Sequence, residues 1–214
     1  MTIKDDVIDI QALRKGGSID GKPVYSRDTT TLNSYRNFVV SGEKNSEGQS
    51  YKSQVFGYVY NKNNGTDKGT RRSNAFSAGE VTAPDDPIFA SDNQFTYKGD
   101  AFIGNTQGIL KGTSEFNVNF GKKELEGDLR FKNIYLENWR EYSNFAENIH
   151  LKGNIDKNTF TAEGKVGSGF FGSDVLANGQ FYGESAAEMG GTFQVGTGIL
   201  DGSKGSGSFG AIKQ

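Results

Sequence analysis

The fold is decided by the stretch Gly179-Gln-Phe-Tyr-Gly-Glu-Ser-Ala-Ala-Glu-Met-Gly-Gly-Thr-Phe193. Small and large apolar residues alternate at both of its ends, as Ala177-Gly179-Phe181 and as Gly191-Phe193-Val195. This period of two predicts two strands that each bury one face. Gly183 and Gly190 enclose Ala and Glu, which are good helix formers, so we expect one helical turn between the two strands.

The same alternation recurs in six further segments of the second half, namely Phe95–Ala101, Phe116–Phe120, Leu125–Phe131, Ile149–Ile155, Phe160–Val166 and Gly207–Ala211. Eight short strands with tight turns between them predict an antiparallel up-and-down β-barrel. Glycine and alanine alternate with large rings on the apolar face, which favours an interior filled by side chains rather than a ligand cavity.

The first half of the chain has a different composition. All three prolines lie before residue 88, whereas 21 of the 30 glycines lie in residues 93–214. The segment Ala83–Ile88 has the Pro- and Asp-rich composition of a linker, so we divide the chain into residues 1–92 and 93–214. Within the first part, Arg36–Val40 and Gln54–Tyr60 read as strands and Asn74–Thr82 as a weaker third. The sequence therefore predicts an all-β protein with a small β domain before the barrel.

Composition excludes several classes of function. The 214 residues include no Cys and one His, which removes thiol nucleophiles, Cys-ligated metals and two-His metal sites. The formal net charge of −2 offers no basic face for nucleic acid. No apolar stretch reaches 18 residues, and no set of acid, base and nucleophile can be assembled. We therefore expect no enzyme, no metal and no resident cofactor.

The candidate ligand-binding residues lie in two regions. The predicted loop Asn133–Asn148 carries four aromatic residues, which either contact a ligand or pack on the first half of the chain. These residues are Tyr135, Trp139, Tyr142 and Phe145. The second set lies in the first half and comprises Tyr58, Tyr60, Arg71 and Arg72.

Two further features can be interpreted either as ordinary structural residues or as functional ones. His150 lies between two core residues of a strand, so it should point out of the barrel as an ordinary surface or interdomain residue. Its functional alternative is a haem ligand, and Tyr58 and Tyr60 are the other candidates for that role. Glu184 and Glu188 stand four residues apart, and we interpret them as part of a solvated turn rather than a catalytic pair.

The run Gly179–Phe193, with the closing Gly207-Ser-Phe-Gly-Ala211, resembles the barrel signature of the transferrin-binding protein B-like family. Phe95–Phe102 and Phe116–Gly127 look like its first barrel strands, and they are most similar to the subgroup of Slam-dependent surface lipoproteins and hemophilins. The resemblance covers about residues 93–214.

The resemblance implies an N-terminal handle-like domain, which would be the ligand-binding part, followed by an eight-stranded barrel. It also implies a non-enzymatic protein that is exported by a Slam-type outer-membrane translocator and is either lipid-anchored at the bacterial surface or secreted. Such proteins bind a host protein or another host surface molecule and mediate host association or colonisation. The alternative that it implies is a haem-binding protein, although hemophilins hold haem through His in the N-terminal part, where this chain has none.

Overall fold

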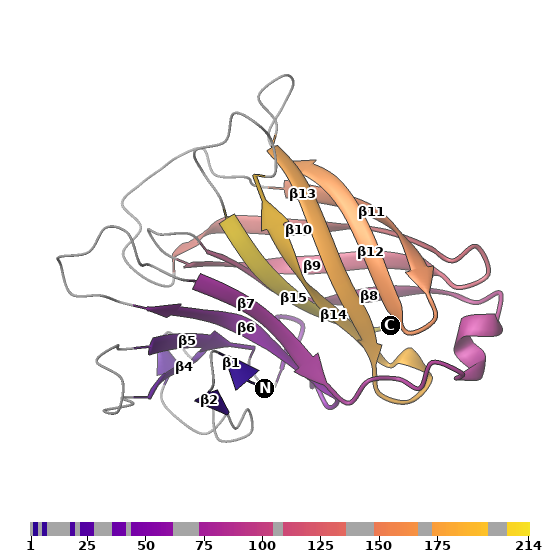
Figure 1. The fold of residues 1–214 in the computed structure, drawn as a ribbon, viewed down its shortest axis with the longest axis horizontal. Helices are drawn as coiled ribbons and strands as arrows, with labels where there is room; N and C mark the ends of the chain where they lie inside the picture. The colour runs from indigo at the N-terminus through magenta and orange to yellow at the C-terminus, as the bar shows by residue number, and fades with distance from the viewer. Residues whose placement is uncertain are drawn as a thin grey trace.

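The computed structural model describes residues 2–3, 6–7, 18–19, 22–27, 36–41, 44–61, 73–104, 109–135, 148–166, 173–196 and 205–214. Among these residues, no helix has the length and apolar character needed to cross a membrane. The described elements form a two-stranded sheet, a five-stranded sheet and a closed eight-stranded barrel (Figure 1).

The barrel confirms the predicted architecture. Its strands are β8 (Gln94–Gly104), β9 (Ile109–Asn119), β10 (Glu124–Tyr135), β11 (Asn148–Asp156), β12 (Thr159–Val166), β13 (Ser173–Tyr182), β14 (Glu188–Val195) and β15 (Gly205–Lys213). Each strand pairs antiparallel with the next, and β15 closes the barrel on β8. All eight segments predicted from alternation fall on these strands, with Phe120 alone lying one residue past the end of β9, and the predicted helical turn is the 3-10 turn η3 (Glu184–Ala186).

Glycine provides the room that large rings need inside this narrow barrel. At four inward glycines, the ring of the phenylalanine directly opposite takes the space of a Cβ, in the pairs Gly112–Phe131, Gly127–Phe116, Gly179–Phe160 and Gly207–Phe193. A Cβ at any of these glycines would collide with the partner's ring. The rings fill the interior and contact one another, as Phe116 and Phe209 do with centroids 5.0 Å apart. This is the alternation of small and large inward residues expected from the sequence.

The N-terminal sheet consists of β3 (Ser18–Ile19), β4 (Lys22–Arg27), β5 (Arg36–Val40), β6 (Gln54–Asn61) and β7 (Ser73–Gly79), in that order. The strands predicted at Arg36–Val40, Gln54–Tyr60 and Asn74–Thr82 correspond to β5, β6 and β7, whereas β4 was not predicted. Two short strands, β1 (Thr2–Ile3) and β2 (Asp6–Val7), form the separate two-stranded sheet. The 3-10 turn η1 (Pro87–Ala90) lies between β7 and the barrel.

The N-terminal sheet packs on the outer wall of the barrel over β14, β15 and β8. Its apolar contact is a buried cluster of Tyr51, Phe56, Tyr58 and Phe102, the last from β8. Outward glycines of the barrel admit these rings. At Gly104, for example, a Cβ would lie 2.6 Å from Cζ of Tyr58. The sheet therefore lies closer to the barrel than side chains on those positions would allow.

Buried polar contacts fix the direction in which the N-terminal sheet lies. Gln54 Nε2 donates to the carbonyls of Met189 (3.0 Å) and Ala211 (3.1 Å), and Ser208 Oγ donates to the carbonyl of Gly57 (2.7 Å). Because a buried donor without an acceptor costs about 1–3 kcal/mol, these bonds penalise any sliding of the sheet along the barrel.

Candidate functional site

The two ends of the barrel differ in their connections. Tight turns join the strands at one end, at residues 120–123, 157–158 and 183–187. The connections at the other end span residues 105–108, 136–147, 167–172 and 197–204, which lie outside the described residues. Because successive strands of an up-and-down barrel run in opposite directions, these four connections all begin and end at one rim. We call it the open rim.

The N-terminal sheet adds a fifth connection at the same rim. The phenol of Tyr58 on β6 lies against Gly104, the last residue of β8, and its oxygen is 3.5 Å from Oγ of Ser206 near the start of β15. The other end of β7 lies against Tyr182 at the turn end of the barrel. The segment 62–72 between β6 and β7 therefore joins two strands whose ends face the open rim.

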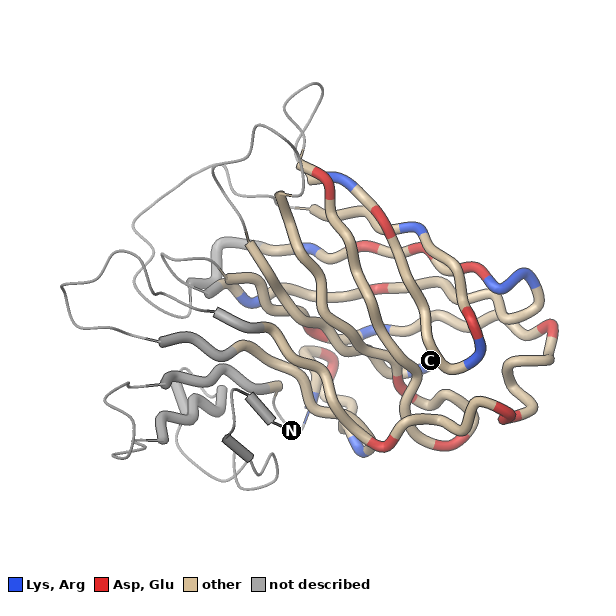
Figure 2. Tube along the Cα trace, viewed as in Figure 1, with Lys and Arg blue, Asp and Glu red and all other residues tan. Residues whose placement is uncertain are grey.

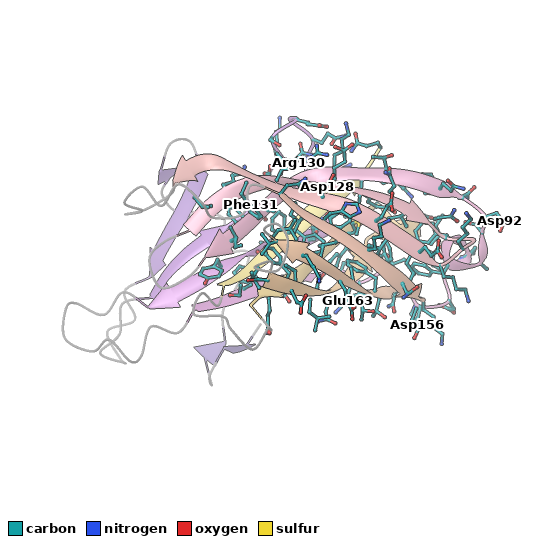
Figure 3. The ribbon with its side chains drawn as sticks, turned by 90° about the horizontal axis from the view of Figure 1, so that it is seen from above. Asp92, Asp128, Arg130, Phe131, Asp156 and Glu163 are labelled. Carbon is teal, nitrogen blue, oxygen red and sulfur yellow. The ribbon has the colours of Figure 1, made fainter. Side chains whose placement is uncertain are left out.

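A cluster of polar and charged side chains lies on the outer wall of β9, β10 and β11 next to this rim. Asp128 accepts hydrogen bonds from Nη2 of Arg130 (2.8 Å) and pairs with Nδ1 of His150 (2.9 Å), and Arg130 also reaches Glu115 (3.5 Å). Figure 3 shows Asp128 and Arg130 together on the outside of the barrel. We call Glu115, Asp128, Arg130 and His150 the outer-wall cluster.

The electrostatics of the outer-wall cluster favour an ionised Asp128. Partial burial disfavours its charged form, but the hydrogen bonds from His150 and Arg130, together with the Arg130 charge, outweigh burial and lower the pKa of Asp128 below its ordinary value. His150 points outward with about half of its side chain exposed, as predicted from its position in the strand.

A groove adjoins the outer-wall cluster over β11, β12 and β13. Leu176 lies in it and is 40% exposed, which makes it one of two exposed large hydrophobic side chains among the described residues. The groove is also lined by His150 and by charged residues of both signs, namely Lys152, Glu163, Lys165 and Asp174. Acidic and basic positions alternate over this part of the barrel (Figure 2). An apolar side chain inside a charged rim is the usual anatomy of a protein contact.

The predicted site residues fall into three groups. Tyr58 is fully buried between the N-terminal sheet and the barrel. Tyr60 and Tyr135 belong to β6 and β10 close to the open rim, where the structure describes the backbone only. Arg71, Arg72, Trp139, Tyr142 and Phe145 lie outside the described residues, in segments that join strands at the open rim. The sequence did not single out Asp128, Arg130 or Leu176.

The interpretation of Glu188 as part of a solvated turn is wrong. The helical turn ends at Ala186, and Glu188 begins β14 with 3% of its surface exposed. Its Oε1 accepts hydrogen bonds from the backbone N–H groups of Lys52 (2.6 Å) and Ser53 (3.1 Å), which precede β6. Glu188 therefore anchors the N-terminal sheet on the barrel, while Glu184 is exposed.

The described residues contain no group of three or more His, Asp or Glu side chains placed to hold a metal ion. The outer-wall cluster has charge and hydrogen-bonding capacity, and the groove adds exposed apolar surface. This combination is suited to contact with another macromolecule.

The chain is similar to several known proteins. It matches the family model of the C-lobe and N-lobe beta barrels of Tf-binding protein B over residues 45–213, which runs across the boundary predicted at residue 92. A protein of Haemophilus influenzae strain Rd described as uncharacterized is 33% identical over 89 residues, which cover 42% of this chain and 25% of that protein.

Solved structures of transferrin binding protein B have the same fold. A mutant of the protein from Haemophilus parasuis Hp5, described as a vaccine antigen, matches with a TM-score of 0.61 and 23% identity over 92% of this chain and 38% of that chain. A double mutant of that protein is 27% identical, with a TM-score of 0.58 over 89% of this chain and 37% of that chain. The isotype 1 protein from serogroup B Neisseria meningitidis is 18% identical, with a TM-score of 0.56 over 92% and 36%.

This chain thus spans a quarter of the length of its curated relative and less than two fifths of the solved proteins. Its family match nevertheless covers most of its own residues, including the N-terminal strands β6 and β7 and the whole barrel. The chain belongs to the transferrin-binding protein B family, in the part of it that forms the lobe beta barrels.

Proposed function

We propose that this chain is a non-enzymatic binding protein of the Gram-negative cell surface. It binds a host protein at its open rim and in the adjoining groove around Leu176. The observation that carries the proposal is the asymmetry of the barrel. Connections of up to twelve residues gather with the end of the N-terminal sheet at one rim, while the opposite end has short turns. Loops on a rigid β scaffold are where binding residues concentrate.

The sequence of the rim connections supports this proposal. Trp139, Tyr142 and Phe145 lie in one connection and Arg71 and Arg72 in another, and Trp, Tyr and Arg are the residues enriched at binding hot spots. Leu176 adds an exposed apolar anchor beside the rim. Because the solved relatives are named for binding transferrin, transferrin is the first host protein to test.

Surface display and export belong to the same proposal. A lipid anchor or release from the cell, export through a Slam-type translocator, and a role in host association or colonisation are its further parts. They rest on the family membership and on the resemblance to Slam-dependent surface lipoproteins, and genetic deletion of such a translocator tests them by surface labelling.

Binding is tested by immobilising the chain and measuring the affinity of iron-loaded and iron-free host transferrin. We expect Trp139→Ala and Leu176→Ala each to weaken binding at least about tenfold, since a hot-spot residue contributes more than about 1.4 kcal/mol. Lys122→Ala, an exposed change in a turn at the opposite end, is the matched control and should leave the affinity unchanged. Equal losses in all three variants would contradict binding at the open rim.

Haem binding through His150 is the competing expectation. The outward ring of His150 faces solvent and bonds to Asp128, and the groove beside it is an open surface groove with Lys152 and Glu163 in its lining, not an enclosed, ring-sized apolar slot. A hemin titration separates the two: we expect no saturable Soret band. A one-to-one band that disappears in His150→Ala would replace the host-protein proposal by haem transport.

A further inference from the structure

A second groove lies on the outer wall of the barrel over β8, β9, β10 and β11, in the half next to the tight turns. Its volume of about 680 Å³ falls within the range of about 300–1,000 Å³ that is usual for small-molecule sites. The outward side chains that line it form two rows, and each row crosses all four strands. The first row is Gln94, Asn119, Glu124 and Asn154, and the second is Thr96, Asn117, Glu126 and Lys152. We call the space over these eight side chains the amide groove.

The amide groove differs in chemistry from the groove around Leu176. None of its eight outward side chains is apolar, so it lacks the anchor that a protein contact normally buries. Five of the eight carry no charge, because they are amides or a hydroxyl. Lys152 Nζ pairs with Glu126 (3.2 Å), and this leaves Glu124 as the one charge of the two rows without an ion-pair partner among the described residues. A lone carboxylate disfavours an anionic ligand.

The first row carries hydrogen-bonding groups that the protein does not use. The side chains of Gln94, Glu124 and Asn154 make no hydrogen bond or ion pair with any other residue that the structure describes, and all three are exposed. Asn119 Oδ1 accepts from a backbone N–H of the following turn (2.9 Å), which leaves its Nδ2 available. Because a carboxamide both donates and accepts and a carboxylate accepts, the row presents both kinds of group side by side.

The spacing of the first row indicates the kind of ligand that fits it. Neighbouring strands lie about 4.8 Å apart, so the row repeats at that interval and spans about 14 Å from Gln94 to Asn154. This repeat is close to the length of one pyranose unit in an extended oligosaccharide. Each sugar hydroxyl is a donor and an acceptor at once, and amide and carboxylate side chains satisfy both roles. An oligosaccharide of three or four units can therefore meet about one side chain of the row per unit.

We propose that the amide groove binds a neutral oligosaccharide, which lies across the strands along the row from Gln94 to Asn154. The second row supports the same ligand from the side. Thr96 Oγ1 donates to Asn117 Oδ1 (3.0 Å), which fixes the amide of Asn117 and leaves its Nδ2 to donate to a sugar hydroxyl. This site lies in the half of the barrel away from the open rim, so it is separate from the proposed site for a host protein and goes beyond it.

The test begins with a glycan array probed with the full chain. The array carries neutral and anionic glycans of host type and fragments of bacterial polysaccharides, so it also distinguishes the two sources of a neutral oligosaccharide. Isothermal titration calorimetry then measures the affinity for the best neutral tetrasaccharide and for its monosaccharide unit. We expect the tetrasaccharide to bind and the monosaccharide to bind much more weakly, because a single unit meets only one side chain of the row.

Variants with one exposed side chain removed assign the site. Asn154→Ala and Glu124→Ala should each weaken tetrasaccharide binding about three- to tenfold, which is the loss expected for one or two hydrogen bonds. Asn148→Ala is the matched control, because it removes the same kind of exposed side chain from the same strand outside the groove, and it should leave the affinity unchanged. In NMR spectra the side-chain amide signals of Gln94, Asn119 and Asn154 should shift as the tetrasaccharide is added.

Three results would overturn the proposal. The first is an array on which no neutral oligosaccharide binds. The second is a preference for anionic glycans, since Glu124 would repel them. The third is binding that Asn154→Ala and Asn148→Ala weaken equally, because such binding does not depend on the amide groove.

Discussion

The seam between the N-terminal sheet and the barrel can be tested at one pair of residues, Gly104 and Tyr58. A Cβ on Gly104 would lie 2.6 Å and 2.7 Å from Cζ and Cε1 of Tyr58 and 3.0 Å from its hydroxyl oxygen. All three atoms belong to the N-terminal sheet and none to the barrel. Because the ring of Tyr58 is fully buried, it has no free space into which to turn.

We therefore expect Gly104→Ala to destabilise the protein by overpacking, which costs about 1–3 kcal/mol in a packed interior. Tyr58→Ala removes the whole ring and should cost about 3–5 kcal/mol. If the two effects were independent, the double variant would lose about 4–8 kcal/mol. Without the ring, however, the new methyl group finds space, so the double variant should be about as stable as Tyr58→Ala alone.

The assay is urea unfolding followed by far-UV circular dichroism, with a double-mutant cycle on the free energies of unfolding. Tyr58→Phe is the matched control, because it keeps the ring atoms that clash and should leave the cost of Gly104→Ala nearly intact. The reasoning is refuted if Gly104→Ala and Tyr58→Ala add within about 0.5 kcal/mol, the limit expected for residues that do not interact.

Three further predictions concern single contacts. Glu188→Ala should lower the free energy of unfolding by about 2–4 kcal/mol, since it removes the buried carboxylate that accepts hydrogen bonds from two backbone N–H groups. Glu188→Gln should lower it less, and thermal unfolding at neutral pH measures both. Gly127→Ala should cost about 1–3 kcal/mol through collision with Phe116 inside the barrel, and calorimetry should show this as a lower Tm for the barrel. In an NMR titration the carboxyl of Asp128 should have a pKa below its ordinary value of 3.8, and His150→Ala should raise that pKa. The stability that this ionisation contributes is present above the ordinary pKa and is lost as the pH falls through the lowered value. An unshifted pKa would refute the pairing of Asp128 with His150 and Arg130.

The barrel could be predicted from the sequence because its signal is local. That Phe160 and Ala162 both face inward follows from alternation within one strand, and eight such strands with tight turns leave few architectures. The strand β4 was missed because Lys22–Arg27 contains Pro23 and shows no clear alternation. Its pairing with β5 is a property of the assembled sheet rather than of its own residues.

The seam itself could not be predicted. Gly104 points outward and Gly127 inward, yet both look the same in the sequence, and only the assembled structure shows that one admits Tyr58 and the other Phe116. Glu188 was misread for the same reason, because a backbone segment more than a hundred residues away covers it. Leu176 could not be singled out from the sequence, since exposure depends on what the other elements leave uncovered.

The closure of β15 on β8 has a consequence for the order of folding. These two strands are the last and the first of the barrel, so their pairing closes the longest loop in it and comes late in a kinetic sense. The N-terminal sheet docks on this same pair and on β14. Although it is synthesised first, its docking surface does not exist until the final strand has arrived. Closure of the barrel and docking of the N-terminal sheet therefore both wait for the pairing of β15 with β8.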